Sequence, residues 1–138
     1  MNKIDFYYED CSFVYKGKIA TRNWINRAIK ENNKQLGAIS VIFCSDNYLL
    51  KINQDYLNHD YFTDIITFDY CEDNIVSGDL FISRDMIRAN AEKFGVEFID
   101  ELHRVIIHGV MHLVGFKDKT DEEAQTMRAQ ENYWLERF

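Results

Sequence analysis

The chain has 138 residues, of which 46% are hydrophobic, and it carries a formal net charge of −7 at pH 7. This length and apolar content predict a folded domain with its own core and exclude a disordered chain. The negative charge argues against binding nucleic acid through charge alone, because such binding needs Lys and Arg to displace counterions from phosphates. Any nucleic acid would have to bind at a local site.

The sequence lacks several features that would indicate a membrane or secreted protein. No segment approaches the ~18 consecutive apolar residues of a membrane span, and the polar start lacks the apolar segment of a signal peptide. The three cysteines include no C-x-x-C pair, which disfavours a disulfide framework or a thiolate zinc site. Without proline, repeats or a linker, residues 1–138 are predicted to form a single domain in the cytoplasm, with no membrane contact.

Hydrophobic periodicity predicts helices and strands in alternation. In chain order we expect a strand at 4–8, a helix around 24–29, a strand at 38–44, a short helix capped by Ser45 or Asp46, strands at 64–68 and 78–83, and helices at 85–94, at 98–114 and from 121 onward. Gly95 and Gly115 suit helix ends, and Thr120 to Glu123 matches a capping box. The predicted fold class is α+β, with a small mixed sheet packed by helices and helix 98–114 in the core.

His108 and His112 say most about chemistry. Four residues apart on a helix, they share one face about a turn apart, where both imidazoles can bind one ion. Gly115 lets the chain turn back and deliver Asp118 as a third ligand. Two His nitrogens and one carboxylate oxygen leave a coordination position open, which is typical of catalytic zinc. We therefore predict a metal-dependent hydrolase in which a metal-bound water, with its pKa lowered towards ~7, is the attacking group.

A peptidase is one alternative. The spacing H-x-x-x-H-x-x-G-x-x-[H/D] also matches the zinc motif of metzincin peptidases. In those enzymes a Glu follows the first His as general base, whereas Gly109 stands here and has no side chain to move a proton. The general base therefore stays unassigned. A second alternative is a non-catalytic domain that binds the ribosome or a protein and uses the ion as a structural pin.

The same stretch contains residues with simpler interpretations. The His pair could be hydrogen-bonded packing, and Asp118 could be surface charge or a local cap. His103 lies roughly 140° around the helix from His108 and cannot join the same ion. Glu101, two turns before His108 on the same face, is either a hydrogen-bond acceptor behind the ligands or an exposed helix carboxylate.

Three ordered segments resemble the YbeY family of bacterial endoribonucleases, also called rRNA maturation factors. Residues 108–116, HGVMHLVGF, resemble the family signature H-G-x-L-H-L-x-G-Y. Residues 63–68, TDIITF, resemble its T-D-V-L-S-F strand, and residues 78–83, GDLFIS, resemble its G-D-I-x-I-S strand. The resemblance covers about residues 39–135.

This resemblance implies an α+β fold and a zinc-dependent endonuclease specific for single-stranded RNA. The implied role is hydrolysis of RNA at the 3′ end of small-subunit (16S) rRNA, in ribosome biogenesis and quality control in the cytoplasm. The implied partners are single-stranded RNA or rRNA and the ribosome or its proteins, with no DNA expected. His108 and His112 would bind one Zn²⁺ per chain, and the strand from Asp64 would line the cleft.

The chain departs from the family pattern in two places. The family's third His ligand is replaced by Asp118, and the Asp before it by Lys117. A carboxylate still suits zinc, but it makes the ion a weaker Lewis acid and admits another divalent metal such as manganese. Residues 59–62 form a shorter segment than the family's and lack its Arg, which is thought to neutralise phosphate. Lys117, Asp64 and Arg84 are our candidates for substrate binding, with Lys117 as the replacement cation.

Overall fold

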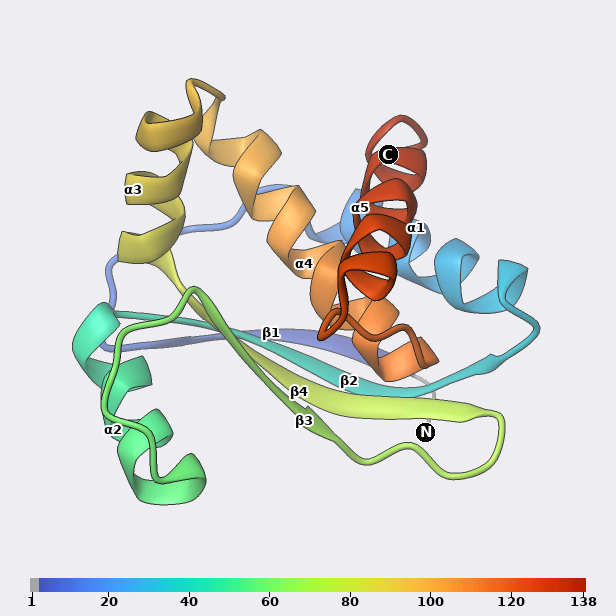
Figure 1. Cartoon of the computed structure of the whole chain (residues 1–138), viewed down its shortest axis with the longest axis horizontal. Coiled ribbons are helices and arrows are strands. Elements are labelled where there is room, and N and C mark those ends of the chain that lie inside the picture. The colour runs from blue at the N-terminus through green and yellow to red at the C-terminus, as the bar shows by residue number, and fades with distance from the viewer. Residues whose placement is uncertain (1–2) are drawn as a thin grey trace.

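The structure, a computed structural model, describes residues 3–138 (Figure 1). Five helices and four strands make up this part of the chain, in the order β1 (Lys3–Glu9), α1 (Lys18–Glu31), β2 (Gln35–Cys44), α2 (Asp46–Leu57), β3 (Ile65–Asp69), β4 (Ile75–Ser83), α3 (Arg84–Phe94), α4 (Phe98–Val114) and α5 (Asp121–Leu135). The α+β class expected from the sequence is confirmed.

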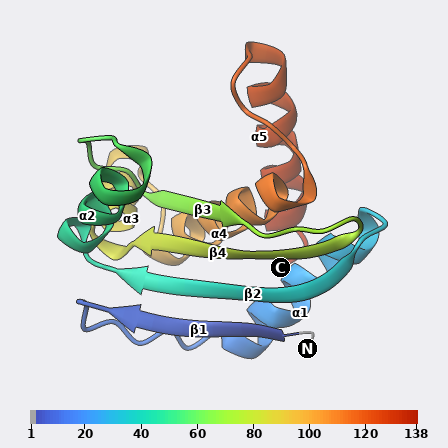
Figure 2. The same ribbon diagram turned by 90° about the horizontal axis from the view of Figure 1, so that it is seen from below.

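The four strands form one mixed sheet in the order β1-β2-β4-β3 (Figure 2). β1, β2 and β4 are parallel, whereas β3 pairs antiparallel with β4 and forms one edge. β2 and β4 each begin three residues before the expected start, because their pairing continues beyond the apolar runs at Gln35 and Ile75. The edge strand β3 is the one that borders the chemistry described below.

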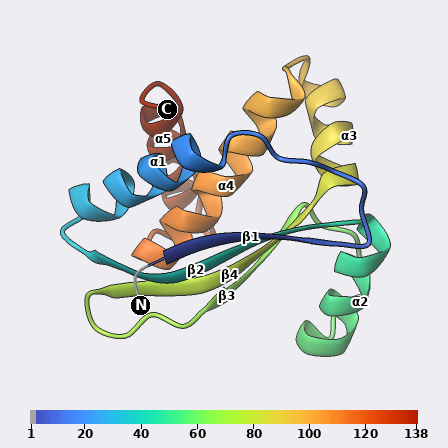
Figure 3. The ribbon, with the colours of Figure 1, turned by 180° about the vertical axis from the view of Figure 1, so that it is seen from behind.

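Helices cover the sheet unequally. α1, α3, α4 and α5 lie on one face, and α2 lies on the other (Figures 1 and 3). A large core forms beneath α4, and a small cluster of Cys44, Leu49, Ile52 and Ile66 forms under α2. α4 packs on the sheet and against α1, α3 and α5, which explains its apolar sequence. No helix in residues 3–138 has both the length and the apolar character that crossing a membrane requires.

A glycine lets α4 approach the sheet closely. A Cβ atom at Gly109 would lie 2.8 Å from Ile65 Cδ1 and 2.9 Å from Leu80 Cδ2, closer than such atoms can pack. The residue after His108 therefore faces the sheet rather than the solvent. This contact determines how close His108 lies to β3.

Helix ends follow the expected chemistry. Ser45 caps α2 by accepting a hydrogen bond from the backbone N–H of Tyr48. Thr120 and Glu123 form a complete capping box at the start of α5. Gly115 has φ 125°, a backbone conformation that favours glycine, and the N–H of Phe116 donates to the carbonyl of Met111. The chain is thereby turned back from α4 toward α5.

Candidate metal centre

Three ligand atoms meet at the C-terminal end of α4. The Nε2 atoms of His108 and His112 are 3.1 Å apart, and Asp118 Oδ2 lies 3.2 Å from His112 Nε2 and 3.3 Å from His108 Nε2. Nitrogen and oxygen ligands of tetrahedral zinc, at about 2.0–2.1 Å from the ion, are about 3.3 Å from one another. Both the donor set and its spacing therefore fit one divalent ion. Within residues 3–138 this is the only such group of His, Cys, Asp or Glu.

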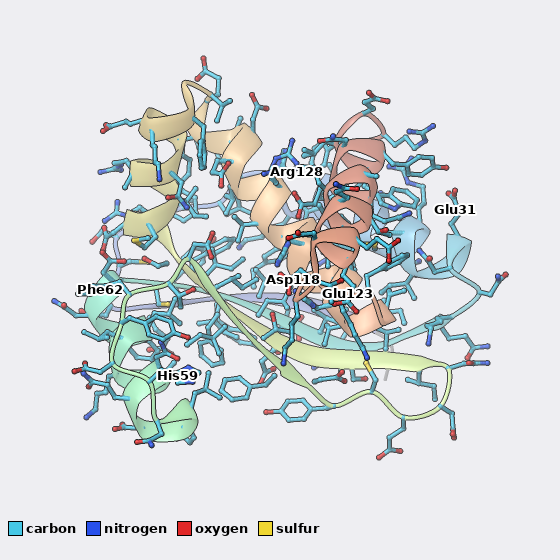
Figure 4. All side chains as sticks on the ribbon, viewed as in Figure 1. Glu31, His59, Phe62, Asp118, Glu123 and Arg128 are labelled. Atoms are coloured by element: carbon cyan, nitrogen blue, oxygen red, sulfur yellow. The ribbon has the colours of Figure 1, made fainter. Side chains whose placement is uncertain are left out.

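Two local features deliver these atoms. The four-residue step on α4 places both imidazoles on one face, and the turn after Gly115 returns Asp118 to them. Figure 4 shows Asp118 where α4 and α5 meet. All three side chains are partly exposed, so solvent and substrate can reach the ligand atoms.

A buried carboxylate orients His108 from behind. Glu131 of α5 lies 2.7 Å from His108 Nδ1 through Oε2, and its Oε1 accepts a hydrogen bond of 2.8 Å from Arg104 Nη1. A proton on Nδ1 leaves Nε2 with a free lone pair toward the ion position. Met127, Glu131 and Trp134 form the buried stripe of α5. Glu131 was not predicted from the sequence, although its helical spacing from Met127 and Trp134 indicates a buried acid.

The pair shifts the pKa of both partners. Burial disfavours the charged imidazolium of His108, but the hydrogen bond and charge of Glu131, with the charges of Asp118 and Asp64, outweigh it and raise the pKa of His108. Burial acts to raise the pKa of Glu131, yet hydrogen bonds from His108 and Arg104 leave that pKa below its usual range. The surroundings of His108 therefore stabilise a positive charge at this position.

Two depressions meet at His108. The first, of about 530 Å³, lies between β3 and the end of α4, and we call it the metal-side pocket. Its polar lining consists of Thr63, Asp64, Thr67, Asp69 and the three candidate ligands. The second, of about 630 Å³, lies among α3, α4 and α5, and we call it the α3–α5 pocket. Both are lined by Asp64, Ile65 and His108, so one ligand can occupy both.

The predicted substrate-binding residues lie in different places. Asp64 lines both pockets, and burial raises its pKa. Lys117 is exposed beside Asp118 and lines neither pocket. Arg84 begins α3, with its Nε 3.4 Å from Asp85 Oδ1, and it too lines neither pocket. The structure thus brings only Asp64 of the three directly into the site.

The structure contradicts the sequence-based expectations for one further residue, Glu101. Glu101 is only 6% exposed and makes no hydrogen bond with His108, so both of its sequence-based interpretations are wrong. Its position depends on how α3 and α5 cover α4, which helix periodicity does not reveal. His103 lies 3.2 Å from the Tyr15 hydroxyl through Nε2, apart from the ligand group. Figure 4 shows His59 beside α2, away from Asp118.

Comparison with known proteins identifies relatives. A family model described as "Endoribonuclease YbeY" matches residues 11–138. The chain is 55% identical over 115 residues to the Endoribonuclease YbeY of Bacteroides thetaiotaomicron, covering 83% of this chain and 84% of that protein. It is 49% identical over 131 residues to that of Porphyromonas gingivalis, covering 95% and 87%. The solution structure of TM1509 from Thermotoga maritima superposes with a TM-score of 0.68 at 25% identity, covering 97% of this chain and 87% of that one.

Proposed function

Since this chain belongs to the YbeY family of endoribonucleases, we propose that it is a metal-dependent endoribonuclease that hydrolyses single-stranded RNA. From the family resemblance, the proposal extends to 16S rRNA 3′-end maturation and ribosome quality control, with zinc as the ion and the cytoplasm as the location. One observation carries it: three ligand atoms 3.1–3.3 Å apart, from residues that line an open pocket.

The charge of the metal-side pocket supports a requirement for an ion. Asp64, Asp69 and Asp118 all line it, and an RNA phosphate brought among them would be repelled. A divalent ion held by His108, His112 and Asp118 would offset this charge, polarise the phosphoryl oxygen and activate a water. Binding of the substrate phosphate would thus depend on the ion.

Single-stranded RNA suits this site better than a duplex. The net charge of −7 leaves little attraction for the regularly spaced phosphates of a double helix. An unpaired strand can instead turn a single phosphate into a pocket and splay its bases into neighbouring depressions. The two adjoining pockets at His108 offer that arrangement.

Arg128 is the cation best placed to contact phosphate. It lines the α3–α5 pocket together with His108, and its side chain is 62% exposed. Its contact with Glu131 is long, at 3.5 Å, whereas Arg104 is held by Glu131 and Asn132 at 2.8 and 2.9 Å. Arg128 is labelled in Figure 4 on α5. We assign it the role of the Arg that the shortened 59–62 segment lacks, with Lys117 as a second cation outside the pocket.

Asp64 is our candidate for the general base. In residues 3–138 it is the one carboxylate that lines both pockets, so it faces the position where substrate and ion would meet. Burial is the main cause that raises its pKa, which brings the carboxylate closer to the range useful for accepting a proton near neutral pH.

The alternatives receive less support from the geometry. A peptidase base at position 109 would point into the packed contact with Ile65 and Leu80, not toward the ion. A structural pin is favoured by four protein ligands closed to solvent, whereas this group supplies three that are partly exposed.

A cleavage assay tests the proposal. Protein loaded with Zn²⁺ or Mn²⁺ should cut an unstructured RNA internally, leave its duplex form intact, and lose activity when a chelator removes the ion. Re-addition of metal should restore cleavage. Cleavage that persists in chelator, or that attacks the duplex equally, would exclude this function.

A further inference from the structure

Glu101 is a buried acid that the proposed chemistry does not use. It is 6% exposed, faces the α3–α5 pocket, and has no hydrogen-bond donor or ion-pair partner among residues 3–138. Burial, followed by the charge of Asp64, raises the pKa of Glu101. The oxygens of Glu101 are not among the fully buried polar atoms that lack a partner in residues 3–138, so its carboxylate is open toward the pocket and can accept hydrogen bonds from a ligand that enters it.

The position of Glu101 relates it to the candidate metal centre. It precedes His108 by seven residues on α4, which is about two turns, or about 10.5 Å along the helix axis, on the same face. Because the α3–α5 pocket also contains His108, a strand with its phosphate at the ion can place a neighbouring nucleotide there. Arg128 lines the same pocket and can contact the phosphate between the two nucleotides.

The walls of the pocket suit a flat ring with N–H groups. The exposed side chains of Phe94 and Val96 line it, together with the partly buried Leu135, and offer apolar surface for stacking. Asp100 and Glu101 supply acceptors, which would repel a phosphate. A second metal ion is not indicated, because no other group of ligands in the described residues lies at the required spacing.

We propose that the α3–α5 pocket binds an unpaired base next to the cleaved phosphate, and that Glu101 selects guanine. This inference rests on the proposed endoribonuclease function. An ionised carboxylate only accepts hydrogen bonds. Guanine presents two adjacent donors, N1–H and the 2-amino group, on its Watson–Crick edge. Adenine and cytosine present one amino group beside a ring acceptor, and uracil presents one N–H between two carbonyls.

The test compares single-stranded RNAs of U residues that contain one G, A or C at the same position. The metal-loaded enzyme should cleave the G strand at a fixed distance from the G and about tenfold faster than the others, as expected for a bidentate contact. Glu101→Gln, in which an amide N–H₂ replaces one acceptor, should reduce this ratio to near one. Glu97→Gln is the matched control, because Glu97 is the exposed N-cap residue of α4, four residues before Glu101, and lies outside this pocket. It should keep the ratio.

A binding experiment distinguishes the assignment of the α3–α5 pocket from the proposed endoribonuclease function. Titration of the zinc-loaded protein with 5′-GMP and 5′-UMP, followed by NMR of the α4 amides, reports the base alone, since both share the phosphate. GMP should shift the signals around Glu101 at lower concentration than UMP, and Glu101→Gln should remove that difference. Guanine-selective shifts without RNA cleavage would overturn the nuclease function and keep the pocket. Cleavage without base preference, equal binding of both nucleotides, or a preference unchanged in Glu101→Gln would overturn the pocket assignment.

Discussion

His103 and His108 lie on the same helix, yet their surroundings differ completely. The ring of His103 stacks on Phe138 at 3.9 Å and lies 5.7 Å from Trp24, and burial lowers its pKa. His108 is partly buried, as His103 is, but it faces Glu131 and its pKa is raised. We call these two sides of α4 the aromatic side and the carboxylate side. Neighbouring groups, rather than residue type or burial, make one histidine a packing residue and the other a candidate ligand.

The largest effect should come from removing a ligand on the carboxylate side. His112→Ala should lower bound zinc from about one per chain to none and reduce RNA cleavage to background, because two remaining ligands hold the ion poorly. His103→Phe, on the aromatic side, should keep both. Metal analysis after gel filtration and a cleavage assay measure the two variants. Equal metal content in both variants would contradict the assignment of metal binding to the carboxylate side.

Asp64→Asn should separate proton transfer from ion binding. Loss of a general base typically lowers kcat by about 10²–10⁴-fold. Metal content should stay at the wild-type level, because Asp64 is not one of the three candidate ligands. Steady-state kinetics on one unstructured RNA, with metal analysis of the same sample, check this. A normal kcat would remove Asp64 from the mechanism.

Glu131→Gln should have a smaller effect on the ion. The amide keeps the size of Glu131 but removes the charge that orients His108, and loss of such partners typically costs about 10–100-fold in metal affinity or activity. The pKa of His108 in the metal-free protein should fall, because the group that raises it is gone. Competition with a zinc chelator gives the affinity, and NMR titration gives the pKa. An unchanged affinity would mean that Glu131 only ties α5 to α4.

Glu101→Gln should have the smallest effect, on stability in the absence of RNA. Burial raises the pKa of Glu101, so its folded-state contribution is fully present below the unfolded pKa and is lost as pH rises through the folded value. Gln avoids this loss, and the variant should melt at a higher temperature than wild type near pH 7. The gain should vanish toward pH 4, where Glu101 is protonated. Thermal melts across pH measure the difference, and a gain that grows on acidification would contradict it.

Local patterns predicted the features that local geometry determines. The helical spacing of His108 and His112, the turn at Gly115 and the capping box at Thr120 all follow from short-range rules, and the structure places each where expected. Asp118 reaches the pair because that turn is short. The α+β class followed from the alternation of periodicities.

Features that depend on packing between distant elements were not predictable in this way. Glu131 meets His108 only because α5 packs against α4, 23 residues later in the chain. Glu101 is buried because α3 and α5 enclose its side of α4, and Arg84 lies outside the site because α3 begins beyond it. For Glu101 and Glu131, the signal that the sequence offered was a polar residue within an apolar helical stripe.

X-ray absorption spectroscopy of the zinc-loaded protein tests the central claim most directly. We expect four light-atom neighbours at about 2.0–2.1 Å, with the multiple scattering of two imidazoles and no sulfur. Asp118→His should raise the imidazole number to three. A sulfur neighbour at about 2.3 Å would assign the ion to cysteine. That result, or fewer than two imidazoles, would contradict a centre at His108, His112 and Asp118.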